Sequence, residues 1–478
     1  MLTPADVNSS SFGLLRVLSV DGKVDAQPLY VSHLAIAGAA HDVVFVATEH
    51  DSVYAFDAQT GAILWQKSLL GSGESTSDDR GCGQVTPEIG VTSTPVIDKT
   101  AGPGGAIFAV AMSKDSSSNY YQRLHALDIT TGAELFGGPV TINPTYSSPA
   151  GGQKAFSPGQ YAERAALLLA NQTIYTSWTS HCDVQPYSGW IVGFSETTLA
   201  QTAVLNVAAD SDGGPSVWMS GGGLAADSGG SIYLITANGT FEPTLTSGGF
   251  PQNGDYGNSI LRLSTTGGSL AVADYFAPSN EVAESAADLD LGSGGPMLLP
   301  DVTDSGGVVH HLMVGAGKDG NLYVINRDNM GKFSSSANAD WQELDGALPG
   351  GVFATPAYLN GTVYYGDIGG SLKAFTVASA KLSSVPASVT TTQFPYPGTS
   401  PSVSANGTSN GIVWAVQNSN PAVLHAYDAT DLHELYNSTQ AAGGRDNFGA
   451  GNKFITPTVA DGMVFVGTTN GVAVFGER

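Results

Sequence analysis

Residues 45–66 read FVATEHDSVYAFDAQTGAILWQ, a stretch that contains three short strands separated by polar turns. Alternating apolar side chains predict the strands, and the run from Asp57 to Gly61 has the composition of a tight turn. Seven further strands followed by a similar or degraded turn begin at Arg123, Trp190, Ser259, Asn321, Ser371, Val423 and Gly471. Recurrence of one pattern along a chain predicts an array of similar structural units.

A second element precedes each copy: a short strand that is opened by Pro or Gly and built from small apolar residues. Its copies begin at Ala26, Thr92, Glu163, Ser220, Ser293, Phe353, Thr399 and Phe454. Pro28 and Pro457, in the first and last copies, are 429 residues and seven intervals apart, or about 61 residues per unit. Small residues suit the innermost strands of a propeller, because these strands converge on the axis.

A third strand lies between these two elements in each unit, for example at 43–49 and 174–180. The last unit, 454–478, ends after its third strand, and the unpaired segment 12–20 (FGLLRVLSV) can supply the fourth. We therefore predict an all-β fold in a single domain, 1–478: one eight-bladed β-propeller of four-stranded antiparallel blades, closed by the N-terminal strand joining the C-terminal blade. A pair of β-sandwiches with similar turns is the alternative.

The composition excludes several classes of protein. The net charge of −24 repels phosphate backbones, so nucleic-acid binding is not expected. No apolar run approaches the roughly 20 residues that cross a bilayer, so we predict no transmembrane segment. The N-terminus lacks the features of a signal peptide, which fits a cytosolic protein or a mature secreted form. The scarce Lys and the polar surface favour a secreted or periplasmic protein, and we expect a monomer.

With these repeats identified, the chain resembles the quinoprotein alcohol dehydrogenase-like superfamily, eight-bladed propellers with pyrroloquinoline quinone (PQQ)-type repeats. VYAFDAQTGAILWQ, from Val53, and GNLYVINRDNMGKF, from Gly320, carry the resemblance, which covers essentially the whole chain. It is closest to secreted or periplasmic PQQ-repeat proteins without an assigned reaction. The superfamily includes dehydrogenases, scaffolds of outer-membrane protein assembly and propellers that bind no quinone, so the resemblance leaves the function open.

In the dehydrogenases of this superfamily, PQQ lies in the axial funnel above a Trp and beneath a disulfide of two adjacent cysteines, with a calcium ion and an Asp base nearby. The segment KDGNLYVINRD is similar to the one whose Lys contacts the quinone, and the resemblance assigns that role to Lys318. Adjacent cysteines are absent, since Cys82 and Cys182 are 100 residues apart. No motif matches the Asp base, the calcium ligands or the Trp. Binding of PQQ with calcium is left open.

Basic residues are concentrated in the loops that should line one mouth of the propeller, before the first strand and between the second and third strands of each blade. Six of the 18 Lys and Arg residues lie there: Lys114, Lys154, Arg164, Lys318, Arg445 and Lys453. In a chain of charge −24, such a cluster would form a focused positive site for a carboxylate or another anion. Alternatively, each pairs with a neighbouring acid, as Lys318 would with Asp319 and Arg445 with Asp446.

Residues able to transfer protons or to stack lie in the same loops. His181 is the first candidate acid or base, because an imidazole titrates near neutrality; the alternative is a histidine bound to a loop carbonyl. Glu88 and Asp319 are further catalytic candidates, and Trp218 is a candidate for stacking on a ligand. Polar residues that accompany them are His50, Asp51, Asn238, Asp367 and Asn418.

The two cysteines should lie on one rim of adjacent blades, Cys82 before the first strand of blade 2 and Cys182 in a loop of blade 3. They form either a disulfide, which would indicate an oxidising compartment, or two buried thiols. The Asp-rich loops 210–214 and 288–295 offer oxygen atoms of the kind calcium prefers, but their spacing favours solvated turns, and we predict no metal site.

Three functions remain. In the first, an extracytoplasmic propeller binds an anionic small molecule, a carbohydrate or a protein partner in its funnel without catalysis. In the second, a PQQ-dependent oxidoreductase oxidises alcohols or sugars. In the third, a lyase or glycosidase acts on an acidic saccharide, with His181 or Glu88 transferring a proton.

Overall fold

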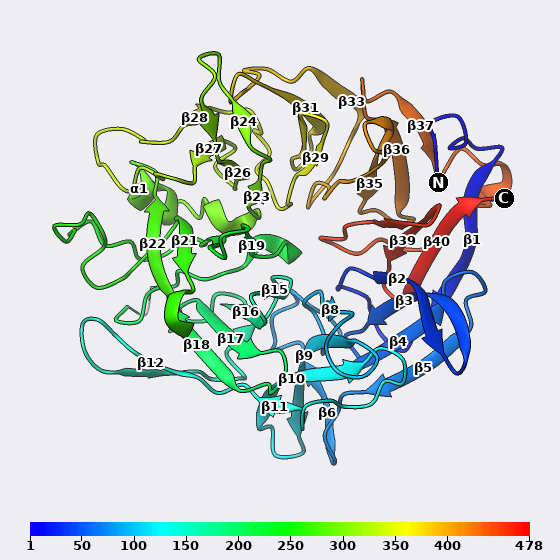
Figure 1. Ribbon diagram of the computed structural model, residues 1–478, viewed down its shortest axis with the longest axis horizontal. Helices are drawn as coiled ribbons and strands as arrows, with labels where there is room; N and C mark the ends of the chain where they lie inside the picture. The colour runs from blue at the N-terminus through cyan, green and yellow to red at the C-terminus, as the bar shows by residue number, and fades with distance from the viewer. Residues whose placement is uncertain (212) are drawn as a thin grey trace.

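The computed structural model describes residues 1–211 and 213–478, and its main antiparallel sheets form a ring of eight blades (Figure 1). The colours of the chain pass once around this ring, so each blade is built from consecutive sequence except where the two ends meet. Each blade contains four strands in antiparallel order, counted outward from the axis. The predicted all-β, eight-bladed propeller is confirmed.

Blades 1 to 4 follow one another along the first part of the chain. Their strands are β2 (Leu29–Ile36), β3 (Ala39–Ala47), β4 (Ser52–Asp57) and β5 (Ile63–Ser68); β8 (Val96–Asp98), β9 (Ala106–Asp115), β10 (Tyr120–Asp128) and β11 (Val140–Thr141); β15 (Leu168–Ala170), β16 (Thr173–Ser180), β17 (Trp190–Ser195) and β18 (Gln201–Asn206); β19 (Ala225–Ala226), β20 (Ile232–Ile235), β21 (Ile260–Ser264) and β22 (Ala271–Phe276).

Blades 5 to 8 complete the ring. Their strands are β23 (Met297–Leu298), β26 (Leu312–Ala316), β27 (Leu322–Asn326) and β28 (Gln342–Leu344); β29 (Ala357–Leu359), β30 (Thr362–Gly366), β31 (Ser371–Ala378) and β33 (Ser388–Gln393); β34 (Ser402–Asn406), β35 (Ser409–Gln417), β36 (Val423–Asp428) and β37 (Glu434–Asn437); β38 (Thr458–Ala460), β39 (Met463–Gly467), β40 (Gly471–Glu477) and β1 (Phe12–Ser19).

Short elements decorate the blades. These are β6 (Glu74–Asp78), β7 (Glu88–Ile89), β12 (Thr145–Ser147), β13 (Gln153–Ala155), β14 (Tyr161–Ala162), β24 (Val302–Thr303), β25 (Val309–His310), β32 (Lys381–Leu382), the helix α1 (Glu281–Ala286) and the 3-10 turns Met219–Gly221, Thr266–Gly268, Leu291–Ser293 and Ala442–Gly444. Within the described residues, no helix is long and apolar enough to cross a membrane.

The ring is closed by the two ends of the chain, as the sequence predicts. Strand β1 pairs antiparallel with β40, from Phe12 opposite Glu477 to Ser19 opposite Gly471. Both termini lie beside this blade (Figure 1). The pairing covers the outer edge of β40, which would otherwise expose unpaired backbone groups.

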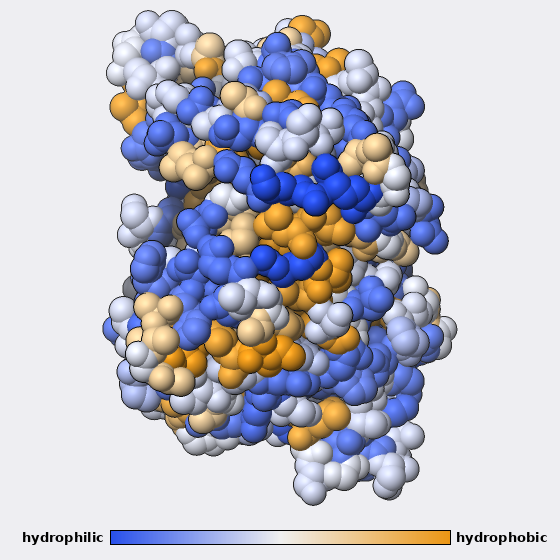
Figure 2. All heavy atoms as spheres, turned by 90° about the vertical axis from the view of Figure 1, so that its right-hand side faces the viewer, coloured by the Kyte–Doolittle hydropathy of each residue, from blue (hydrophilic) through white to orange (hydrophobic). Residues whose placement is uncertain are grey.

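The hydrophobic core lies between neighbouring blades. One cluster joins Trp414 of blade 7 to Val464 of blade 8 and to Phe12 of the closing strand, all without exposed surface. Figure 2 shows the side of the molecule that carries the termini as a largely polar surface with an apolar area among the polar atoms. Val17 of β1 and Ile63 of β5 are exposed apolar side chains of these outer strands.

The axis is crowded where the innermost strands begin. A Cβ atom added to Gly222 or Gly295 would lie 2.2 or 2.4 Å from Oγ1 of Thr355. Blades 4, 5 and 6 therefore meet here at a distance that only glycine permits. This contact gives the physical reason for the small residues that the repeat carries at this point.

Candidate functional site

A cavity of about 450 Å³ lies on the axis, at the end of the blades where the innermost strands begin. Five of its lining residues occupy one equivalent position, four residues before the innermost strand of their blade: Asp25, Thr92, Arg164, Phe353 and Phe454. The other blades carry Gly221, Ser293 and Gly398 there. One repeat position thus places a charge or a ring on the axis in some blades and leaves space in others.

The glycine of blade 4 makes room for the arginine of blade 3. A Cβ atom on Gly221 would lie 2.6 Å from Nη1 of Arg164, and the backbone of Gly221 has a φ of +91°, which favours glycine. The guanidinium group of Arg164 therefore lies across the position of a missing side chain. A larger residue at position 221 would displace it.

Arg164 is a buried cation without a hydrogen-bonded partner. Its side chain is buried, with 6% of the residue exposed, and neither Nη1 nor Nη2 donates a hydrogen bond within the described part of the chain. Its guanidinium carbon lies 5.5 Å from the ring centre of Phe454. Burial lowers the pKa of Arg164, although Asp25 and Glu49 oppose the shift; an arginine remains protonated even so.

The two lysines of the cavity differ in their pairing. Lys453 lies 5.6 Å from the ring centre of Phe454, and no carboxylate of the described residues forms an ion pair with it. Burial lowers the pKa of Lys453. Lys318, in contrast, contacts Asp288 at 3.0 Å and Asp290 at 2.5 Å. The charge of Lys318 is therefore compensated, whereas that of Lys453 is not.

Two buried carboxyl groups, those of Asp25 and Glu49, lie close enough to Arg164 to interact with its charge. Asp25 contacts Nζ of Lys23 at 2.9 Å and accepts a hydrogen bond from Asn452 at 2.6 Å. Glu49 accepts hydrogen bonds from the amide of Gly90 and the hydroxyl of Thr92. Burial next to Asp25 raises the pKa of Glu49 well above its ordinary value. Asp25 interacts electrostatically with both Lys23 and Arg164, but in the described residues it forms an ion pair only with Lys23.

Blade 3 contributes three more buried groups with an unpaired atom that line the cavity. They are Oε1 of Glu163, Oγ of Ser180 and Nε2 of His181. Strand β14 brings them together, because it pairs Tyr161 with Ser180 of β16. Burial raises the pKa of Glu163 to about 8. Burial, assisted by the charge of Arg80, lowers the pKa of His181 to about 4. Near neutral pH both side chains are uncharged.

His181 differs from every other histidine of the chain. The other eight each have a carboxylate within 3.7 Å, and all nine histidines lie in the described part of the structure. His181 instead hydrogen-bonds to the backbone of Tyr161, and its Nε2 is buried without a hydrogen-bond partner among the described residues. One alternative expected from the sequence is that His181 is bound to a loop backbone. This holds for one of its two ring nitrogen atoms and not for the other.

Four aromatic side chains form a continuous cluster on the cavity wall. Trp218 lies edge-on to Phe353 with ring centres 5.4 Å apart and to Phe454 with ring centres 6.0 Å apart. Tyr396 lies edge-on to Phe353 at 5.7 Å. Phe454 has a φ of +64°, a conformation that costs a bulky residue about 1–3 kcal/mol and that concentrates at functional sites.

The cysteines form a disulfide at the rim of the cavity. Cys82 and Cys182 have Cα atoms 5.6 Å apart, and the bond joins the loop before blade 2 to a loop of blade 3. Gln84, near one cysteine, and Asp183, next to the other, line the cavity. The bond therefore fixes two lining loops to each other.

Two predicted ligand residues lie outside the cavity. Arg445 donates to its neighbour Asp446 at 2.7 Å and to the carbonyl of Phe12 at 2.9 Å, so it clamps the closing strand at the outer edge of the ring. Lys154, on the β12–β13 hairpin, donates to the carbonyl of Ser211 at 2.8 Å. The structure places neither residue in the lining of the axial cavity, because the connection from one blade to the next starts at the outer edge and reaches the axis with its last residues.

The predicted catalytic residues Glu88 and Asp319 are also absent from the lining of the cavity. Glu88 accepts hydrogen bonds from Thr76 at 2.6 Å and His50 at 3.0 Å, and it lines a second hollow of about 570 Å³ at the rim. Asp319 accepts a hydrogen bond from the hydroxyl of Tyr323 at 2.7 Å, and burial raises its pKa. Lys318 pairs with Asp288 and Asp290 rather than with Asp319, as described above. Lys114, also expected at the mouth, pairs with Asp78.

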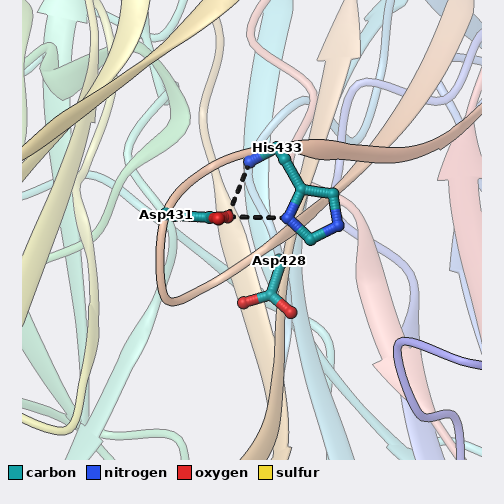
Figure 3. Close-up of side chains that lie close together, drawn as sticks. All are labelled: Asp428, Asp431 and His433. Atoms are coloured by element: carbon teal, nitrogen blue, oxygen red, sulfur yellow. Dashed lines mark hydrogen bonds and ion pairs between the residues drawn. The ribbon is translucent and has the colours of Figure 1, made fainter.

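Asp428, Asp431 and His433 are the one group of acids and histidine in the described residues close enough to hold a metal ion (Figure 3). Asp431 accepts hydrogen bonds from the backbone and ring nitrogens of His433. Asp428 caps its turn through the amide of Thr430, as Asp57 and Asp128 cap theirs in other blades. These three residues therefore belong to a turn that recurs in other blades. Of the two Asp-rich loops, 288–295 is paired with Lys318, and Asp212 of 210–214 lies outside the described residues.

The cavity contains residues that the sequence alone did not single out: Asp25, Glu163, Phe353 and Phe454. What identifies these residues is their position in the repeat. All but Glu163 lie four residues before an innermost strand, and Glu163 is next to that position. A comparison of the eight strand openings would have found them. Arg164, Lys318, Lys453, Trp218 and His181, singled out from the sequence, all line the cavity.

Comparison with known proteins relates the chain to propellers of two kinds. Residues 19–135 match the family model described as Outer membrane protein assembly factor BamB. No curated protein sequence matches the chain. Among solved structures, the quinohemoprotein alcohol dehydrogenase from Comamonas testosteroni is similar, with 14% identity and a TM-score of 0.59 over 100% of this chain and 78% of that chain.

Two further solved structures show the same likeness. A europium-containing methanol dehydrogenase is 13% identical, with a TM-score of 0.58 over 100% of this chain and 95% of that chain. BamB from Moraxella catarrhalis is 13% identical, with a TM-score of 0.53 over 98% and 100%. The comparisons fit the resemblance to PQQ-repeat propellers. At such identities they show a shared fold, and that fold serves both enzymes and an assembly factor.

Proposed function

We propose that this PQQ-repeat propeller binds a small carboxylate or a similar anion in its axial cavity. The observation that carries the proposal is Arg164, which is buried with both terminal nitrogens unpaired. An unpaired buried charge is costly, and a carboxylate can accept two parallel hydrogen bonds from a guanidinium group. A bound anion would therefore relieve the cost that the apo protein bears.

The charges around Arg164 support the same ligand. Lys453 adds a second positive charge on the same wall that has no ion-pair partner among the described residues, and burial raises the pKa of the neighbouring Glu49. The rest of the chain is strongly acidic, with a net charge of −24. A positive cavity in an acidic protein focuses anions on one point.

Calorimetric titration of the purified protein with small carboxylates and their uncharged amides tests the proposal. We expect the carboxylates to bind and the amides to bind much more weakly. Arg164→Gln should weaken carboxylate binding about tenfold to a hundredfold, since hydrogen bonds to charged groups contribute about 1.5–3 kcal/mol. Lys381→Gln, which removes an exposed lysine of β32, is the matched control. Equal binding of acids and amides, or full binding by Arg164→Gln, would refute the proposal.

Quinone-dependent oxidation is a second candidate, favoured by the fold shared with a quinohemoprotein alcohol dehydrogenase. The residues do not fit the arrangement that the resemblance implies. The ammonium group of Lys318 is held by Asp288 and Asp290, and the disulfide joins distant residues rather than neighbours. We derive no reaction step from it. Quinone absorbance that stays with the protein through gel filtration, after incubation with PQQ and calcium, would revive this candidate.

We further propose that the protein is extracytoplasmic and that residues 1–478 form one domain. The disulfide between Cys82 and Cys182 supports an oxidising compartment. The pairing of β1 with β40 supports one domain, because the ring is complete only when both ends of the chain contribute. A cytosolic location of the native protein, with reduced cysteines, would contradict the first proposal.

A further inference from the structure

We propose that the anion bound in the axial cavity is a sugar acid: a pyranose that carries a carboxylate, with its hydroxyl groups on blade 3 and one face of its ring on the aromatic cluster. This inference rests on the proposed function and adds the substrate class. It follows from three sets of cavity groups that differ in chemistry and that one ligand must satisfy together.

The first set requires a negative charge. Arg164 presents two unpaired nitrogens, and Lys453 an ammonium group without a carboxylate partner among the described residues. Both contact the ring of Phe454, at 5.5 and 5.6 Å from its centre, so they point to the same part of the wall. A carboxylate bound there would contact both cations.

The second set requires hydroxyl groups. Glu163, Ser180 and His181 are at most 7% exposed, and each has one polar atom without a hydrogen-bond partner. The neutral carboxyl group of Glu163 can donate a hydrogen bond, the free Nε2 of the uncharged His181 ring can accept one, and the hydroxyl of Ser180 can do both. A sugar hydroxyl also donates and accepts, and several on one ring can pair with all three groups.

The third set requires a flat apolar face. Trp218, Phe353, Tyr396 and Phe454 form one contiguous aromatic wall. Phe454 keeps its place in this wall despite a left-handed backbone. The C–H face of a pyranose is apolar and flat enough to lie on such rings, while its edge carries the hydroxyl groups.

Simpler ligands leave one set unsatisfied. An aromatic or alicyclic carboxylate would pair with Arg164 and cover Trp218, but it would leave the buried polar atoms of Glu163, Ser180 and His181 without partners. A neutral sugar would pair with those three groups and leave Arg164 unpaired. The volume of about 450 Å³ lies in the usual range of small-molecule sites and suits one or two sugar rings.

Titrations with glucuronate, glucose and cyclohexanecarboxylate separate the three requirements in one experiment. We expect glucuronate to bind at least about tenfold more tightly than either of the others, because each of them leaves at least one buried group unpaired. Saturation-transfer NMR should show the strongest transfer to the ring protons of glucuronate that face the aromatic wall. Competition between glucuronate and cyclohexanecarboxylate shows whether both occupy one site.

Two variants should change specificity in opposite directions. Arg164→Gln should remove the preference for glucuronate over glucose. His181→Phe should remove most of the preference for glucuronate over cyclohexanecarboxylate. Circular dichroism and thermal unfolding check that each variant is folded, and Ser180→Ala replaces His181→Phe if the latter does not fold.

The outcomes distinguish this inference from the proposed function. If both carboxylates bind equally well and lose affinity in Arg164→Gln, the site binds anions but the sugar-acid inference is overturned. An unchanged preference in the folded His181 or Ser180 variant overturns it as well. If neither carboxylate binds more tightly than glucose, anion binding itself is refuted.

Discussion

Arg164 at the axis and Arg445 at the outer edge are both arginines in connections between blades, and their surroundings are opposite. Arg445 donates to Asp446 and to the carbonyl of Phe12, and Asp446 also accepts from Tyr436 and from the amide of Leu14. Within the described residues, Arg164 has no such partner. The comparison teaches that a charge paired within the chain serves ring closure, whereas an unpaired charge at the axis is, under the proposed function, available to a ligand.

Removing the acid at the outer edge should have the largest effect. Asp446 is fully buried and accepts four hydrogen bonds. Asp446→Ala should lower the free energy of unfolding by about 3–5 kcal/mol, as expected when one partner of a buried ion pair is lost. Urea unfolding of the variant measures it. Carboxylate binding by the folded fraction should be unchanged, and a stability within about 0.5 kcal/mol of wild type would contradict the clamp.

Removing the disulfide should have the next largest effect. The bond closes a loop of 100 residues, and such bonds stabilise proteins by about 2–4 kcal/mol. The double variant Cys82→Ser, Cys182→Ser should therefore unfold at lower denaturant concentration. Wild-type protein with reductant should match it, while reductant should leave the variant unaffected. Equal stability of oxidised and reduced wild type would show that the bond does not form in solution.

Removing the positive charge of Arg164 at the axis should stabilise the protein rather than destabilise it. Arg164→Met replaces an unpaired buried cation by an apolar side chain of similar length, a change that commonly stabilises by about 1–4 kcal/mol. We expect the variant to unfold at a higher denaturant concentration than the ligand-free wild type and to lose carboxylate binding. A destabilised Arg164→Met protein would mean that Arg164 is paired within the chain after all.

The pH dependence of stability compares a buried carboxyl group of blade 3, Glu163, with a carboxyl group at the rim, Glu88. The pKa of Glu163 is raised from about 4.5 to about 8 by burial, so the unfolded chain releases this proton at lower pH than the folded one. Stability is therefore lost as the pH rises from about 4.5 to about 8, by at most about 1.4 kcal/mol per pH unit. Glu163→Gln should make the loss of stability over that range smaller by this contribution, as comparison of unfolding curves will test, while Glu281 and Glu284, whose pKa values burial raises to about 7, keep theirs. Glu88→Gln, at the rim, should keep the slope.

The fold could be predicted because its signal is repeated. Each blade alone is a set of short strands and turns, but Asp57 and its counterparts recur at a regular interval, and 12–20 supplies the strand that the last unit lacks. Strand β1 spans Phe12–Ser19, within the expected segment 12–20. Each local pattern is weak, but its repetition along the chain predicts one architecture. Small residues such as Gly222 are expected at the axis because the innermost strands are crowded there.

The site could be predicted only in part. Arg164, Lys453 and His181 were found because basic residues and histidines are scarce in this chain. The same reasoning included Arg445 and Lys154, which lie outside the cavity, because scarcity says nothing about how far along a connection a residue lies.

Asp25 and Phe454 were missed for the complementary reason. Acids are common in this chain, and a phenylalanine in a strand-rich fold is usually a core residue, so neither type draws attention to the site. The position of Asp25 and Phe454 in the repeat, rather than their type, brings them to the axis. Whether Arg164 or Arg445 has a partner depends on side chains from other blades. These side chains are distant in the sequence, so no single segment reveals the pairing.

Ring closure has a consequence for when the cavity comes into existence. Lys453 and Phe454 of blade 8 line the cavity together with Asp25 of blade 1 and Arg164 of blade 3. Blade 8 is complete only when β1 pairs with β40. A chain whose blades have not closed into the ring therefore has no complete cavity, however many of them have folded. Under the proposed function, a ligand would stabilise the closed ring relative to every open form.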